Sequence, residues 1–188
     1  NPIVNVVIMF LIIAGGIGFL TWEDICINKI HFRKYHMQSK IILVTTALLI
    51  VLPAVFFFFS DFTHLSVGKR LLASAFQAVT PRTAGFNAVD FTQMNVPSLL
   101  FIIFLMWIGG SPASTAGGIK TSTFALATLN IFAVASGKSR IQLFGRRISS
   151  ESTSRAFAIL CISLITIGIS IVAILIFEPK GTPLLTVA

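Results

Sequence analysis

The most distinctive chemistry in the sequence lies in a short stretch of residues: Thr83, Ala84, Gly85 and Phe86. A cation that crosses hydrocarbon must exchange its water shell for other oxygen atoms, and backbone carbonyls supply these without a full charge that would trap the ion. Thr83 adds a hydroxyl to its carbonyl, and Gly85 allows backbone angles that other residues avoid. The stretch is therefore a candidate cation site, and the alternative is an ordinary turn outside the membrane.

A second unusual stretch is rich in glycine and small polar residues. It comprises Gly109, Gly110, Ser111, Pro112, Ala113, Ser114, Thr115, Ala116, Gly117 and Gly118, and Lys120 flanks it. Four glycines and one proline in ten residues do not hold a regular helix, so we expect an unwound segment over 109–119. A loosely packed kink is the alternative. A phosphate-binding loop is excluded, because glycine and lysine are not adjacent as that motif requires.

The elements that position these stretches are apolar and long. Of the 188 residues, 55% are hydrophobic and only 11% are charged, against about 25% in soluble domains. Apolar runs cover 3–20, 41–59, 99–108 and 156–177. A bilayer core of about 30 Å needs roughly 20 helical residues. The sequence therefore predicts an all-α integral membrane protein, and its ends predict an internal piece of a longer chain.

The net charge of +8 is concentrated between the apolar runs. Nine of the 14 basic residues lie within 21–40 and 136–155. The positive-inside rule predicts that both segments are cytoplasmic loops. This location argues against binding of nucleic acid.

Topology then requires an odd number of crossings between residues 60 and 135. One crossing is the economical choice, and the interval is longer than one crossing needs. Residues 69–79 predict a helix of about 16 Å, half a membrane. The stretch 80–87 follows it, broken by Pro81. Helix 98–108, the unwound segment 109–119 and helix 120–135 come next. A short helix, a glycine turn and an interrupted helix predict a re-entrant hairpin that lines a cavity, as in channels and transporters.

Two strings carry a family resemblance. They are VTPRTAGFN at 79–87 and GGSPASTAGGIKT at 109–121, about 25 residues apart. With them the whole chain resembles the bacterial Ktr/Trk potassium-uptake superfamily, most closely the KtrB-type membrane subunit. Members have four repeats, each with helix M1, a pore helix, a filter loop and helix M2. The resemblance implies that 1–20 ends the second repeat, 41–135 is the third, and 156–188 starts the fourth.

The resemblance also implies roles and partners. Residues 83–86 would be one quarter of a K⁺ selectivity filter, and 109–119 with Lys120 would be the intramembrane gate loop of a broken M2. The transported ion would be K⁺, with stimulation by Na⁺ and no covalent cofactor. The protein would be a multi-pass homodimer in the bacterial plasma membrane, surrounded by lipid and docked on a cytoplasmic ring of nucleotide-binding KtrA-type subunits.

Other readings of the sequence remain open. A non-conducting membrane scaffold would pack its helices through small residues such as Gly15, Gly16 and Gly18. An intramembrane enzyme is disfavoured, because no Ser/His or Asp/Asp constellation lies at a suitable depth. Lys120 is either a charge at a helix end or part of a cationic barrier in the gate. Arg82, a cation beside a cation filter, is expected to point away and pair with an acid.

Overall fold

The computed structural model describes residues 2–29, 31–86, 89, 91, 94–137 and 142–177. The chain divides into two compact units, residues 1–125 and 126–188. Each unit is described by itself below.

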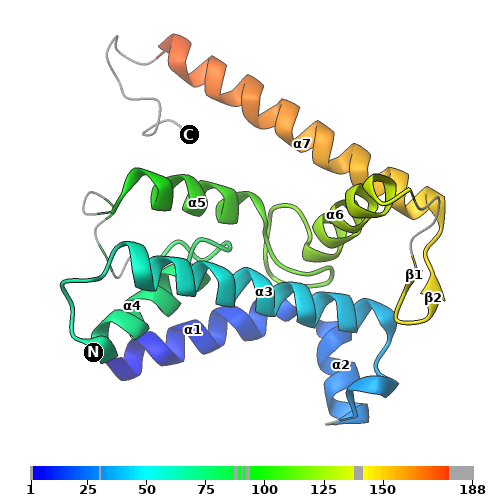
Figure 1. Cartoon of the computed structure of the whole chain (residues 1–188), viewed down its shortest axis with the longest axis horizontal. Helices are drawn as coiled ribbons and strands as arrows, with labels where there is room; N and C mark the ends of the chain where they lie inside the picture. The colour runs from blue at the N-terminus through cyan, green and yellow to red at the C-terminus, as the bar shows by residue number, and fades with distance from the viewer. Residues whose placement is uncertain are drawn as a thin grey trace. The chain divides into compact units, whose positions relative to one another are not determined.

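The first unit consists of helices joined by short connections (Figure 1). They are α1 (Pro2–Ile17), α2 (Phe19–Asn28), the 3₁₀ turn η1 (Phe32–Lys34), α3 (Met37–Ser60), α4 (Val67–Val79), α5 (Val96–Trp107) and the first turn of α6 (Thr121–Ala135). Helix α3 contacts α1, α2, α4 and α5, so it is the element on which the unit is assembled.

The core of this unit lies between α3, α4 and α5. Its buried residues are Leu49, Phe57, Phe62, Ala78, Met94, Ile102, Leu105 and Ile108. Phe57 packs edge-on against Phe101 of α5, with ring centroids 6.0 Å apart. Because lipid tails are as apolar as these side chains, close packing rather than escape from water holds such helices together.

The lengths and compositions of the helices fit a membrane. Helices α3 and α7 (Ser150–Phe177) are each long and apolar enough to cross a bilayer. Helices α1 and α2 pass the same test together but are bent by 96° at Gly18. Helices α5 and α6 are apolar but shorter, with 12 and 15 residues. Many large apolar side chains on α1, α3 and α7 are exposed, as expected of surfaces that face lipid or other membrane helices.

The second unit contains the rest of α6, a small hairpin and α7. Strands β1 (Gln142–Leu143) and β2 (Arg146–Arg147) pair antiparallel across a two-residue turn. Both turn residues, Phe144 and Gly145, have positive φ, the geometry of the tight turns that match the twist of a hairpin. Within described α7 the buried residues are Thr153, Ala156 and Leu160.

Several element boundaries differ from the sequence-based expectation. The hairpin is an addition to the predicted all-α fold. The interval 21–40, expected to be a loop, is helical up to Asn28 and again from Met37. The first apolar helix, expected over 3–20, ends at Ile17. Gly18 has φ of +89°, which an L side chain rarely adopts, so the chain turns there instead of continuing.

Candidate functional site

Helix α4 brings the Thr-Ala-Gly loop (residues 80–87) to its place. Its 13 residues span about 20 Å, and its C-terminal end is the buried one. The loop folds back on that end, since the amides of Ala84 and Gly85 both donate to the Thr80 carbonyl, at 3.3 and 3.0 Å. The Thr80 hydroxyl donates to the Phe86 carbonyl at 2.6 Å. The loop is therefore a closed turn, and Asn87 lies outside the described residues.

The carbonyls of this loop divide into two groups. Those of Thr80, Pro81, Arg82 and Phe86 accept hydrogen bonds from within the loop. Among the described residues, no hydrogen bond reaches the carbonyls of Thr83, Ala84 or Gly85. Thr83 and Gly85 have positive φ, 78° and 69°, and Thr83 is a non-glycine residue in that region. Such backbone strain persists where the surroundings dictate the conformation, and it recurs at functional sites.

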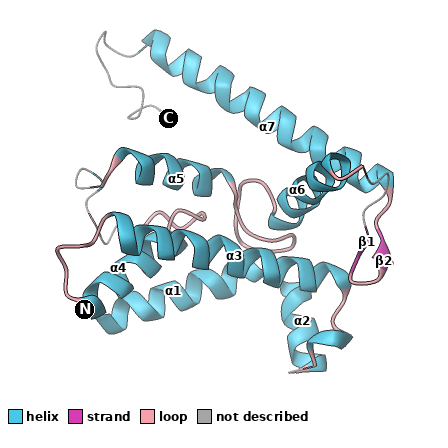
Figure 2. Cartoon of the chain, viewed as in Figure 1, coloured by secondary structure: helices cyan, strands magenta, loops and turns pink. Residues whose placement is uncertain are grey.

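The glycine-rich loop (residues 109–119) separates α5 from α6, and Figure 2 shows it as loop between two helices. Its two ends are joined by a parallel bridge between Ile108 and Ile119, and the Gly109 amide donates to the Ile119 carbonyl at 2.9 Å. The hydroxyls of Ser111 and Thr121 lie 3.0 Å apart, both buried. The loop is therefore closed at its neck and is not an open connection.

Two glycines make this neck possible. A Cβ on Gly109 would overlap the Gly117 carbonyl, and a Cβ on Gly110 would lie against Ala116 and within 2.9 Å of the Ser114 hydroxyl. Gly117, by contrast, has no atom within 4 Å of where a Cβ would stand. The glycines thus have different roles: Gly109 and Gly110 allow the beginning of the loop to pack closely against its end, and Gly117 is not needed for this.

The glycine-rich loop also completes the broken end of α1. A helix leaves its last carbonyls without intrahelical partners. Here the Gly15 and Gly16 carbonyls accept from the amides of Thr115 and Ser111, at 3.3 and 2.9 Å. Beyond the bend, the Phe19 amide that begins α2 donates to the Ala113 carbonyl at 3.0 Å. The bend and the loop therefore stabilise each other.

Gly18 is the residue at which the bend between α1 and α2 lies closest to the glycine-rich loop. A Cβ on Gly18 would collide with the Pro112 carbonyl oxygen. The small residues Gly15, Gly16 and Gly18, which a scaffold reading assigns to packing between helices, contact this loop of the same chain.

For Arg82 the described residues show a contact that the sequence did not predict. Its side chain is turned inward, only 8% exposed, and its Nη2 donates to the Gly109 carbonyl at 3.2 Å. The ion pairs found in the described ranges do not include Arg82. Among the residues that the structure describes, a backbone carbonyl of the glycine-rich loop bonds the guanidinium, and no acid does.

Lys120 directly follows the glycine-rich loop. Its Nζ donates to the Ala116 carbonyl at 2.6 Å, so the ammonium folds back over the loop. Within the described part of the chain, the structure thus brings Arg82 and Lys120 to two different carbonyls of one short segment. Both cations act on its backbone.

The sequence comparison decides the family. A family model described as TrkH, cation transport protein, matches residues 1–181. The chain belongs to the TrkH family.

Relatives of this TrkH-family chain have names that agree. It is 37% identical over 187 residues to a potassium/sodium uptake protein, NtpJ, of Enterococcus hirae. It is 38% identical over 184 residues to the Ktr system potassium uptake protein B of Bacillus subtilis, and 36% identical over 173 to that of Vibrio alginolyticus. These matches cover 97%, 95% and 87% of the chain. The chain spans 41%, 41% and 37% of the relatives' lengths. The family and these relatives are transport proteins and not enzymes.

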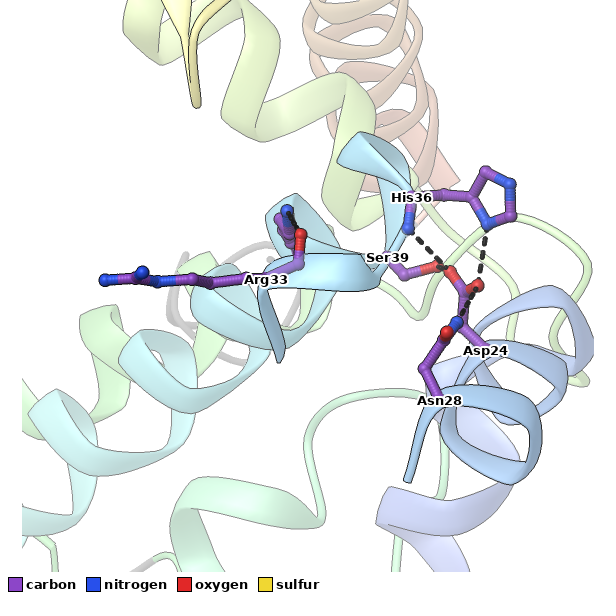
Figure 3. Close-up of polar contacts among 6 residues, drawn as sticks. Asp24, Asn28, Arg33, His36 and Ser39 are labelled. Carbon is purple, nitrogen blue, oxygen red and sulfur yellow. Dashed lines mark hydrogen bonds and ion pairs between the residues drawn. The ribbon is translucent and has the colours of Figure 1, made fainter. Parts of the chain in front are cut away.

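A polar cluster between α2 and α3 of this TrkH-family chain was not predicted from the sequence. Figure 3 shows Asp24 of α2 surrounded by His36, Ser39 and Asn28. Asp24, 2% exposed, accepts from the His36 amide at 3.0 Å and from the Ser39 hydroxyl, and the His36 ring nitrogen lies 2.6 Å away. Burial raises the pKa of the Asp24 carboxyl, but the hydrogen bonds from Ser39 and His36 outweigh it and hold the pKa below the usual 3.8.

This Asp24 cluster holds α2 against the start of α3. Spacing gives no signal for it, because residues 24 and 36 lie in a stretch expected to be a loop. A usable signal was composition: an aspartate in a segment with four basic residues, followed by a histidine and a serine at the start of the next helix.

Proposed function

We propose that this segment is part of a potassium-conducting path in a multi-pass protein of the bacterial plasma membrane. The family and the names of the relatives support cation transport, and two of those names specify potassium uptake. One observation carries the proposal: three consecutive carbonyls, of Thr83, Ala84 and Gly85, have no hydrogen-bond partner within the described residues. Backbone oxygens directed away from other donors are what a dehydrated cation requires.

The Thr-Ala-Gly loop would select the ion. Its carbonyls replace part of the ion's water shell, and their number and direction decide between K⁺ and Na⁺. Helix α4 supports this, because its C-terminal end carries about half a negative charge next to the loop. One such loop supplies about a quarter of a filter, so the remaining oxygens come from three further repeats. In this proposal α3, α4, the loop and α5–α6 together form one repeat.

The glycine-rich loop would be the gate within a broken M2. It is compact, closed at its neck, and bonded to α1 by three hydrogen bonds and to Arg82 by one, so it can be displaced as a unit without unfolding a helix. The same proposal includes K⁺ as the cargo, stimulation by Na⁺, a homodimer, and a cytoplasmic ring of nucleotide-binding subunits. Those partners would meet the basic segments that flank α3 and α7.

The test replaces Gly85 in the full-length protein that contains this segment. Gly85→Asp puts a carboxylate beside the proposed filter, while Gly68→Asp puts the same charge in the first turn of α4, where an acid favours the helix N-terminus. Neither Cβ position has an atom within 4 Å, so packing does not distinguish the two variants, and they differ in that Gly85 has a positive φ that strains any side chain. Uptake of K⁺ is measured in cells that lack their own uptake systems, with Na⁺ as competitor.

Gly85→Asp is expected to abolish K⁺ uptake or remove the preference for K⁺ over Na⁺, and Gly68→Asp to leave both within about two-fold of the parent protein. Both variants are quantified in the membrane fraction. If Gly85→Asp is present at parental levels and transports with parental rate and ion preference, residues 83–86 are not the filter.

A further inference from the structure

Arg82 is a buried cation within a path proposed for cations. Burial of a charge is costly unless hydrogen bonds or an opposite charge compensate. Among the described residues no carboxylate pairs with Arg82, and the compensation that these residues provide comes from backbone dipoles. Arg82 directly follows α4, whose C-terminal carbonyls favour a positive charge. The second dipole is the Gly109 carbonyl, 3.2 Å from Nη2.

These two dipoles belong to different functional segments. Arg82 is part of the Thr-Ala-Gly loop, one position before Thr83. Gly109 is the first residue of the glycine-rich loop. Of the side-chain hydrogen bonds in the described ranges, that of Arg82 joins the two loops directly. A rigid arginine fork fits such a role better than lysine, because it presents several donors in fixed directions.

A small cavity with a largely apolar lining lies next to this contact. Its volume is about 10 Å³, and Ile12, Ile13 and Val79 line it together with Gly16 of α1, Thr46 of α3, Arg82 and Gly110. Thr46 is 6% exposed, and its hydroxyl and the Arg82 Nε are both buried without a hydrogen-bond partner among the described residues. A water molecule needs at least about 10 Å³ and two or more polar partners, and this cavity offers both.

We propose that Arg82 is a positioning residue that fastens the glycine-rich loop to the Thr-Ala-Gly loop, and that a water bridging its Nε to Thr46 completes its hydrogen bonds. The inference rests on the proposed function, since it names what couples the proposed filter to the proposed gate. Displacement of the glycine-rich loop breaks the bond to Gly109 and frees a guanidinium next to Thr83. The position of the gate thereby affects the filter carbonyls through the side chain of Arg82.

Four variants of the full-length protein test this. Arg82→Gln removes the charge and most donors, Arg82→Lys keeps one donor for the Gly109 carbonyl, and Thr46→Val removes the partner across the cavity. Arg70→Gln is the control, because Arg70 lies on α4, the helix that leads into the Thr-Ala-Gly loop, and also donates to a backbone carbonyl, that of Phe58, away from the glycine-rich loop. Two readouts are taken: amide hydrogen exchange of residues 109–119, and K⁺ uptake with Na⁺ competition.

Arg82→Gln is expected to raise exchange of the 109–119 amides by about ten-fold, to raise uptake several-fold and to weaken the preference for K⁺. Arg82→Lys is expected to return amide exchange and uptake part of the way to the parental values. Thr46→Val shifts exchange and uptake in the same direction as Arg82→Gln by about two-fold to three-fold, and Arg70→Gln matches the parent. A merely structural arginine would lower protein level without changing ion preference.

Parental exchange of the glycine-rich loop in Arg82→Gln overturns the proposal. If Arg82→Gln does not accumulate in the membrane, parental exchange in both Arg82→Lys and Thr46→Val overturns it equally. Amide exchange does not depend on which ion is transported, so the role of Arg82 and the proposed function can fail separately. Increased exchange in a protein that shows no K⁺ uptake would support the role of Arg82 and reject the proposed function.

Discussion

Replacing Gly109 by alanine is the sharpest perturbation of the glycine-rich loop. The new methyl would overlap the Gly117 carbonyl oxygen, with the carbonyl carbon 2.7 Å away and the Gly118 Cα 3.1 Å away. All three atoms are backbone, so no side chain can rotate aside. Because ordinary contacts between heavy atoms are about 3.5 Å, the two strands of the neck must separate by more than an ångström.

The cost follows from the bonds that cannot survive this separation. The Gly109 amide bonds the Ile119 carbonyl at 2.9 Å, and the Ile119 amide bonds the Trp107 carbonyl at 3.3 Å. At about 1 kcal/mol of net stability for each, the neck loses about 2 kcal/mol. That corresponds to about a thirty-fold larger population of the opened loop. We expect the Gly109 carbonyl to shift as well, which weakens its bond from Arg82.

Gly117→Ala is the control, because it adds the same methyl to the same loop where no atom lies within 4 Å. Hydrogen exchange of the 109–119 amides, measured on the full-length protein, reports local opening. Gly109→Ala should increase exchange by about thirty-fold and raise K⁺ flux; Gly117→Ala should change neither by more than about two-fold. Equal exchange in the two variants, with both proteins folded, would refute the closed neck and the role assigned to these glycines.

Two further predictions concern the Thr-Ala-Gly loop and the Asp24 cluster. Thr80→Val removes the hydroxyl that donates to the Phe86 carbonyl at 2.6 Å, so the loop loses about 1 kcal/mol of stability. The preference for K⁺ over Na⁺ should therefore fall in uptake assays, while Thr80→Ser should retain the hydrogen bond and the preference. Asp24→Asn weakens charge-assisted bonds from His36 and Ser39 and should lower the free energy of unfolding by about 2 kcal/mol at pH 7 in detergent. The folded pKa of Asp24 lies below its unfolded value of 3.8, so the stability that the Asp24 carboxylate contributes is complete above pH 3.8 and is lost as pH falls through the folded pKa. If Asp24→Asn lost as much stability as the parent over this acidic range, the role of the Asp24 carboxylate would be contradicted.

The long helices were predictable from composition because each needs only an apolar run of sufficient length. The expected span 41–59 lies inside α3, and the expected span 156–177 lies inside α7. The bend at Gly18 was not predictable. A glycine in an apolar run is compatible with a continuous helix, and the bend is stabilised by the glycine-rich loop, nearly a hundred residues away, whose Ala113 carbonyl accepts from the Phe19 amide.

The candidate site was predictable in its residues but not in its contacts. Glycine and proline content located both loops, because those residues act through local backbone geometry. The inward turn of Arg82 depends on a carbonyl 27 residues later, and no charge pattern in the sequence points to a neutral partner. The Asp24 cluster was missed for a similar reason, since it requires that a presumed loop be a helix packed on α3.

The attachments of the glycine-rich loop suggest why it is suited to a gate. Outside its own neck it is held by a few single bonds, to Gly15, Gly16, Phe19 and Arg82. Each contributes about 1 kcal/mol, so the whole attachment is worth only a few kcal/mol. A ligand or partner that favours one state by about 5.5 kcal/mol reverses an equilibrium of 1:99. Since α2 begins at one of these bonds and is fixed to α3 by Asp24, a displacement of α2 would pull on the loop directly at the Ala113 carbonyl.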